Sequence, residues 1–295
     1  MSVKSVLITG ASTGIGEACA LHLDSLGYQV FAGVRKQADA DLLKNRCSDR
    51  LCTVFLEVTD RFSIASAADE LRKTLGDEGL YGLVNNAGIA VASPIEFLPI
   101  EDLRQQFEVN VIGQVMVTQA FLPLIRKARG RIVNISSISG RVAAPFFGPY
   151  SASKFALEAI SDSLRVELSP WGIFVSLIEP GGISTPIWAK SLSEADERLE
   201  GVSTDADRYY HPAIVRSRQM AKHSMTHGLP ASDVALVLEQ ALESAKPKTR
   251  YVIGKGTRIA LLLETLAPVW LRDRFLAKRM GIAEIKIPDN LPPQT

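Results

Sequence analysis

The chain has 295 residues, of which 46% are hydrophobic and 22% charged, and its 33 basic side chains nearly balance its 32 acidic ones. This composition is typical of a globular protein with an apolar core, and the small net charge argues against a nucleic-acid-binding surface. The three cysteines form no metal-ligand or disulfide pattern, so we expect reduced thiols, no metal site and a cytoplasmic location. We also expect no membrane span, which needs about 20 apolar residues in a row.

Apolar runs alternate along the chain with helical patterns. The expected strands cover residues 4–9, 28–34, 51–57, 81–85, 130–136, 172–178 and 250–254. The expected helices cover residues 14–27, 38–46, 60–76, 101–128, 150–170 and 231–245. The strands read as continuous apolar runs, as they do when helices cover both faces of a sheet. The alternation predicts an α/β fold with a doubly wound parallel sheet.

Two later segments depart from this rhythm within the single domain expected for residues 1–295. Residues 186–230 are polar and weakly periodic, which predicts a substrate lid that is poorly ordered without ligand. Residues 255–295 form a C-terminal extension, in which the amphipathic stretch 258–280 is interrupted by Pro268. This stretch could cover a pocket, pack on a neighbouring subunit or lie on a membrane. We favour packing, because Pro268 breaks the helix.

The loop after the first strand reads Thr9-Gly10-Ala11-Ser12-Thr13-Gly14-Ile15-Gly16. Glycines let such a loop turn tightly against a pyrophosphate, and the following helix offers free N–H groups and a positive dipole end. The pattern alone is weak, but its place at the first strand–helix junction favours a dinucleotide site. The candidate contacts are Gly10, Ser12, Thr13, Gly14, Ile15 and Gly16.

The end of the second strand indicates which dinucleotide is bound. A carboxylate there would bind both ribose hydroxyls of NAD, whereas arginine accommodates the 2′-phosphate of NADP. This chain has Val34 followed by Arg35 and Lys36. We therefore favour NADP(H), the alternative being an ordinary solvated basic turn.

Asparagines occupy two informative positions. Asn85 and Asn86 close the fourth strand before Ala87 and Gly88, where we expect a structural role that also shapes the cofactor pocket. Asn110 lies within the expected helix 101–128, although asparagine is a poor helix former. It predicts either a kink with a bound water that connects Lys154 to solvent, or a satisfied buried amide.

Tyr150 and Lys154 are spaced i, i+4, so a helix presents both side chains on one face. A free phenol has a pKa of about 10, and a nearby ammonium favours the phenolate. Ser137, which follows the fifth strand, could hydrogen-bond the same substrate oxygen. Together these three residues predict a proton-transfer site for an alcohol or carbonyl.

The loop after the sixth strand lies where open α/β sheets bind ligands. Its candidate cofactor contacts are Pro180, Gly181, Ile183 and Thr185. Apolar residues flank the expected substrate side and suit a lipophilic ligand, although each could equally belong to the core. They are Ile138, Val142, Phe146, Phe147, Pro186, Ile187 and Trp188.

The ordered set of motifs over residues 4 to 185 resembles the classical short-chain dehydrogenase/reductase family. The matching residues are Thr9-Gly10, Gly14-Ile15-Gly16, Asn85-Asn86-Ala87-Gly88, Asn110, Ser137, Tyr150, Lys154, Pro180-Gly181 and Thr185. The resemblance implies that Tyr150 is the general acid/base and that Ser137 orients the substrate oxygen. It implies that Lys154 lowers the tyrosine pKa and holds the nicotinamide ribose, and that Asn110 supports a water-mediated proton relay.

The resemblance also implies a three-layer Rossmann-type fold of about seven strands, and a homodimer or homotetramer formed through helices 101–128 and 150–170. The family's usual aspartate after the third strand is replaced by Glu57, which with Val58 would face the adenine.

The implied function is NADP(H)-dependent interconversion of a hydrophobic secondary alcohol and ketone, of the kind that steroid and retinol dehydrogenases perform. The alternatives are a 3-oxoacyl thioester reductase and a non-enzymatic dinucleotide-sensing scaffold.

Overall fold

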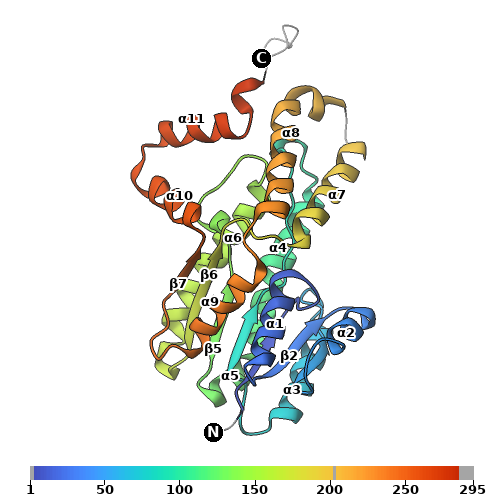
Figure 1. Cartoon of the computed structure of the whole chain (residues 1–295), viewed down its shortest axis with the longest axis vertical. Coiled ribbons are helices and arrows are strands. Elements are labelled where there is room, and N and C mark those ends of the chain that lie inside the picture. The colour runs from blue at the N-terminus through green and yellow to red at the C-terminus, as the bar shows by residue number, and fades with distance from the viewer. Residues whose placement is uncertain (1–2, 202–203, 286–295) are drawn as a thin grey trace.

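The computed structural model describes residues 3–201 and 204–285 (Figure 1). Within these residues, seven parallel strands form one sheet in the order β3-β2-β1-β4-β5-β6-β7. The strands are β1 (Ser5–Ile8), β2 (Gln29–Val34), β3 (Leu51–Phe55), β4 (Gly82–Asn85), β5 (Arg131–Ile135), β6 (Phe174–Pro180) and β7 (Arg250–Ile253). The predicted doubly wound Rossmann-type sheet is confirmed.

Helices cover both faces of the sheet. On one face lie α1 (Gly14–Ser25), α2 (Gln37–Lys44) and α9 (Ala231–Glu243), and on the other lie α3 (Arg61–Leu75), α5 (Gly113–Ala128) and α6 (Gly148–Glu167). Successive residues of a strand point to opposite faces. Val6 and Ile8 accordingly join the core cluster of α1 and α9, whereas Leu7 joins that of α3 and α5. This alternation explains why the strands are apolar throughout.

A helical stretch from Ile100 to Ala128 is long and apolar enough to cross a bilayer, contrary to the sequence-based expectation. It comprises α4 (Ile100–Phe107), a π-helical turn (Glu108–Ile112) and α5. Half of its most apolar 18-residue stretch is buried inside the molecule. Phe121 of this stretch packs in the core between the sheet and the helices α3 and α5. The stretch is therefore a core helix of the fold.

The segment 186–230 is more regular than its sequence indicates. It forms α7 (Pro186–Gly201) and α8 (Thr204–His227), which project from one end of the sheet (Figure 1). Ala213 and Ile214 of α8 pack against Phe146 and Met280 in a small separate core. Tertiary contacts thus stabilise α8, although its sequence is weakly periodic. The role of residues 186–230 as a substrate lid stays a prediction.

The C-terminal extension forms α10 (Lys255–Leu266) and α11 (Val269–Arg279), and the predicted break at Pro268 is confirmed. Large apolar side chains of both helices are exposed, namely Ile259, Leu262, Leu263, Leu266, Val269, Trp270, Leu271 and Phe275. None of the described side chains of these helices lines the cavity defined below. The described part of the extension therefore does not line this cavity, and contact with a neighbouring subunit or a membrane stays a prediction.

Candidate active site

A cavity of about 330 Å³ lies at the carboxyl ends of the strands, between the sheet and α7. The predicted site residues that line it are Gly10, Ser12, Thr13, Gly14, Ile15, Arg35, Glu57, Val58, Asn86, Ala87, Gly88, Ser137, Tyr150, Lys154, Pro180, Gly181, Ile183, Thr185, Pro186 and Trp188. The predicted residues outside its lining are Gly16, Lys36, Asn110, Ile138, Val142, Phe146 and Phe147. Most of the motifs therefore converge on one site.

The loop after β1 is held against the segment after β4. Thr9 Oγ1 accepts the backbone N–H groups of Asn86 and Ala87, each at 3.0 Å, and Asn86 Nδ2 donates to the carbonyl oxygens of Thr9 and Gly10. The structural role expected of Asn86 is what the geometry shows.

Gly16 does not line the cavity, but its lack of a side chain allows the loop after β1 to pack closely against Asn86. A methyl group there would overlap the Gly10 carbonyl oxygen and lie 2.5 Å from Asn86 Nδ2. Gly10 itself has a φ of +63°, a conformation that favours glycine. Thr13, the N-cap of α1, makes no side-chain capping hydrogen bond, so the first backbone N–H groups of the helix are free of it. This cradle of glycines and N–H donors fits a pyrophosphate.

Arg35 lines the cavity directly after β2, where we expect contact with the 2′-phosphate of NADP. Its Nη1 is 3.4 Å from Glu57 Oε2, and its guanidinium is largely exposed, so this pair leaves N–H donors for a phosphate. Lys36, which the sequence pattern groups with Arg35, is the N-cap of α2 and does not line the cavity. Only one of the two basic side chains is thus placed for this contact.

The irregularity expected around Asn110 is confirmed as the π-helical turn Glu108–Ile112. The side chain is fully buried. Its Oδ1 accepts from Ile89 N at 2.9 Å, and its Nδ2 donates to Ile89 O at 3.0 Å and to Ser153 Oγ at 3.1 Å. Asn110 is therefore a satisfied buried amide that ties the loop after β4 to α6, next to Lys154. A water relay through it stays a prediction.

The three proton-transfer candidates meet at the cavity wall. Tyr150 and Ser137 both line the cavity, and hydrogen bonding by the Ser137 side chain acts to lower the pKa of the Tyr150 phenol. Ser137 Oγ also accepts the backbone N–H of Ser139 at 3.1 Å, which fixes its direction. Lys154 Nζ donates to Ile135 O at 2.7 Å and lies 5.8 Å from the centroid of the Tyr150 ring. A substrate oxygen in the cavity can thus meet two hydroxyl groups at once.

That Lys154 lowers the pKa of Tyr150 stays a prediction, because burial is the largest influence on the pKa of this phenol. Burial raises the pKa of the phenol, and the hydrogen bond with Ser137 offsets only part of this. The ammonium is bonded to Ile135 O, and burial lowers the pKa of Lys154 to about 8. Desolvation is therefore the largest cause of the pKa shift of both Tyr150 and Lys154. A phenol that keeps its proton at neutral pH is equipped to donate it to a developing alkoxide.

The expected apolar wall divides into two parts. Trp188 lines the cavity, and its Nε1 donates to Ile183 O at 2.9 Å. Phe147 packs edge-to-face against the Trp188 ring from outside the cavity, at a centroid distance of 6.4 Å. Phe146 has a φ of +68° and packs edge-to-face on Tyr210 of α8. Phe146 and Phe147 therefore support the wall from behind.

The expected apolar residue Ile187 also lines the cavity. Sequence reasoning missed part of the lining, namely Gly33, Val34, Leu56, Ile89, Ala90, Gln105, Val109, Ile135, Ser136, Lys190, Ser191 and Glu194. Ile89 and Ala90 could have been found, because they directly follow a strand-end motif. Lys190 and Glu194 of α7 are spaced i, i+4 and form an ion pair at 3.7 Å, so helical spacing was a usable signal.

Comparisons with known proteins identify the family of the chain. A family profile described as short chain dehydrogenase matches residues 4–196. Mouse retinol dehydrogenase 7 is 40% identical over 278 residues, which cover 92% of this chain and 87% of the relative. The NADPH-dependent 3-dehydrocapnine reductase of Ornithobacterium rhinotracheale is 39% identical over 281 residues, which cover 94% of this chain and 97% of the relative.

Among solved structures, a short-chain dehydrogenase from Streptomyces avermitilis superposes with a TM-score of 0.74 and 27% identity, covering 94% of this chain and 98% of the other. The chain therefore belongs to the classical short-chain dehydrogenase/reductase family, and it is an NAD(P)-dependent dehydrogenase.

Proposed function

We propose that this dehydrogenase uses NADP(H) to interconvert a hydrophobic secondary alcohol and a ketone. The observation that carries this proposal is that Tyr150, Ser137 and Lys154 line the same cavity as the glycine loop. The names of the relatives quoted above, a retinol dehydrogenase and an NADPH-dependent reductase, support it.

The residues would divide the reaction as follows. The glycine loop and the N-terminus of α1 would hold the pyrophosphate, and NADPH when bound supplies the hydride. Ser137 donates to or accepts from the substrate oxygen and orients it, and Tyr150 gives that oxygen its proton. Lys154, in its ammonium form, favours the phenolate that the proton transfer leaves behind.

The NADP(H) preference depends on Arg35. Arg35→Ala should weaken NADPH binding by about tenfold or more and leave NADH binding nearly unchanged, because a charge-assisted hydrogen bond to phosphate contributes about 1.5–3 kcal/mol. Fluorescence titration of both nucleotides measures the ratio. Lys36→Ala serves as the matched control, because Lys36 lies outside the lining and should leave the ratio unchanged. An unchanged NADPH-to-NADH ratio in Arg35→Ala would rule out this role.

The substrate class is proposed from the apolar cavity wall and is tested by a screen. NADPH consumption is followed with steroids, retinoids, medium-chain ketones and 3-oxoacyl thioesters. Turnover of free lipophilic ketones supports the proposal, and turnover of thioesters alone would favour the thioester reductase instead. NADPH binding without consumption of any compound would favour the dinucleotide-sensing scaffold.

We further propose a cytoplasmic homodimer or homotetramer in which α5 and α6 of neighbouring subunits pack together. Phe155 and Val166 support this, because both are large apolar residues exposed on α6. Light scattering on the purified chain measures its mass, and a monomer at working concentrations would contradict the proposal.

A further inference from the structure

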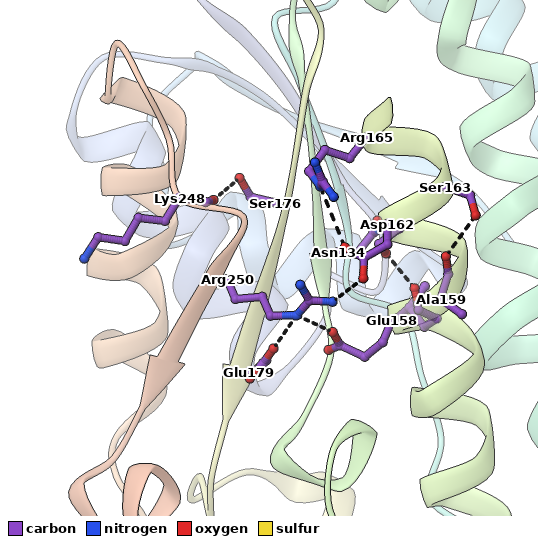
Figure 2. A network of polar contacts seen from close by, with 12 residues as sticks. Asn134, Glu158, Ala159, Asp162, Ser163, Arg165, Ser176, Glu179, Lys248 and Arg250 are labelled. Carbon is purple, nitrogen blue, oxygen red and sulfur yellow. Dashed lines mark hydrogen bonds and ion pairs between the residues drawn. The ribbon is translucent and has the colours of Figure 1, made fainter. Parts of the chain in front are cut away.

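A cluster of charged side chains lies behind the candidate active site, where α6 meets the last two strands of the sheet (Figure 2). The guanidinium of Arg250 on β7 is at its centre. Its Nε lies 2.9 Å from Glu158 Oε2 and 3.1 Å from Glu179 Oε1, and its Nη2 lies 2.6 Å from Asp162 Oδ2. Glu158 and Asp162 belong to α6, and Glu179 belongs to β6. One arginine thus joins three secondary-structure elements.

Two of these carboxyl groups are buried, since Glu158 is 5% exposed and Glu179 0% exposed. A buried charge is tolerated only when it is paired, and here two buried carboxyl groups share one arginine. Arg141 adds a longer contact of 3.4 Å to Glu179. One oxygen of each group, Glu158 Oε1 and Glu179 Oε2, has no hydrogen-bond partner among the described residues. Arg141 and Arg250 therefore do not satisfy all the oxygen atoms of the two buried carboxyl groups.

Glu179 is the most deeply buried carboxyl group of the cluster. Burial raises the pKa of Glu179, the neighbouring Glu158 raises it further, and Arg141 and Arg250 oppose this. Glu158 is paired with Arg250 through its Oε2.

Glu158 is placed to act on Lys154. It follows Lys154 by four residues on α6, as Lys154 follows Tyr150, so the three side chains lie along one helix face. Lys154 is 4% exposed, and its Nζ donates to the neutral carbonyl oxygen of Ile135. Burial lowers the pKa of Lys154 to about 8, and the charge of Glu158 works against that fall. The carboxylate therefore favours the ammonium form that burial disfavours.

We propose that Glu158 is a positioning residue that keeps Lys154 in its ammonium form, and that the ion pair with Arg250 holds Glu158 in place for this purpose. The inference deepens the proposed function and rests on it for its catalytic meaning. The charged and titratable groups around Lys154 are Tyr150, Glu158 and Asp162 of α6, Glu179 of β6, Arg250 of β7 and Arg141 of the loop after β5. Among them, Glu158 alone is an acid one helical turn from the ammonium.

The test measures the titration of Lys154 directly in the full chain. Lysines are labelled with ¹³C at Cε, the Lys154 signal is assigned with Lys154→Arg, and its midpoint is followed by NMR. Glu158→Gln should lower the midpoint by about one pH unit, because it removes the opposite charge that raises the pKa of Lys154. Glu158→Asp, which keeps the charge, should lower it less.

Asp162→Asn is the matched control. It also removes one carboxylate from Arg250, but one helical turn farther from Lys154, and it should leave the midpoint unchanged. An unchanged midpoint in Glu158→Gln, or an equal fall in Asp162→Asn or in Glu158→Asp, would overturn the proposal. A general loss of stability cannot imitate the expected result, because the Lys154 signal is read only from folded protein.

The catalytic consequence is a shift in the pH profile. Without the Glu158 charge, Lys154 loses its proton at lower pH, so the basic limb of kcat/KM should move toward acid by the same amount in Glu158→Gln and stay in place in Asp162→Asn. The experiment separates failure of the proposed function from failure of the role proposed for Glu158. Failure of the wild-type chain to consume NADPH would contradict the proposed function, whereas the NMR midpoint would still decide the role of Glu158.

Discussion

Tyr150→Phe should lower kcat for carbonyl reduction by about 100- to 10,000-fold, the range that general acid–base catalysis contributes. The substitution removes the phenol hydroxyl and keeps the ring in the cavity wall. NADPH affinity should therefore change little, and the loss should appear in kcat. Stopped-flow turnover and nucleotide titration on the same preparation separate the two quantities.

Tyr81→Phe is the matched control for this prediction. The Tyr81 hydroxyl donates to Leu242 O, and Tyr81 does not line the cavity. Its loss should leave kcat near the wild-type value. Near wild-type reduction by Tyr150→Phe would show that another group supplies the proton.

The second large effect is expected from Gly16→Ala. The added methyl group overlaps the Gly10 carbonyl oxygen and crowds Asn86 Nδ2, which itself holds the loop by hydrogen bonds. Overpacking of this kind costs about 1–3 kcal/mol, so the free energy of unfolding should fall by that amount. The displaced loop should also bind NADPH more weakly. Denaturant unfolding and nucleotide titration measure the two effects.

Gly256→Ala provides the comparison. It makes the same change within helix α10, where the new methyl group meets nothing within 4 Å. Because alanine favours a helix more than glycine, this variant should be as stable as the wild type or slightly more stable. Equal behaviour of the two variants would show that close packing at Gly16 does not shape the dinucleotide loop.

The sheet could be predicted from the sequence because its signal is local and repeated. Each strand is a short apolar run such as Val6-Leu7-Ile8, and glycines such as Gly27 and Gly76 lie just beyond helix ends. The site motifs could be found for a related reason. Parallel strands bring their carboxyl ends to one edge, so residues that follow different strands meet there.

The parts that could not be predicted depend on contacts between distant segments. Residues of the helix α8 are buried against Phe146 and Met280, which lie elsewhere in the chain. The polar sequence of α8 does not predict these contacts. The pKa of Tyr150 depends on how deeply α6 buries the phenol and on the carbonyl oxygen of Ile135 that takes the lysine hydrogen bond. Neither quantity is encoded by the i, i+4 spacing.

The charged cluster shows the same limit. Arg250 lies 92 residues after Glu158 and belongs to the last strand, which was expected at residues 250–254 with no part in the site. Glu158 itself reads as an ordinary polar position of a helix. Only the pairing of β7 with β6 brings Arg250 beside Glu179 and within reach of α6.

The most direct test of the account follows the hydrogen that NADPH gives up. With a ketone from the screen and NADPH carrying deuterium at the transferred position, mass spectrometry of the product should find one deuterium on the carbinol carbon. The Tyr150→Phe enzyme should form almost none of this product. A product alcohol that lacks the cofactor's deuterium, or equal labelled product from Tyr150→Phe, would contradict the central claim that this cavity couples hydride delivery to proton donation by Tyr150.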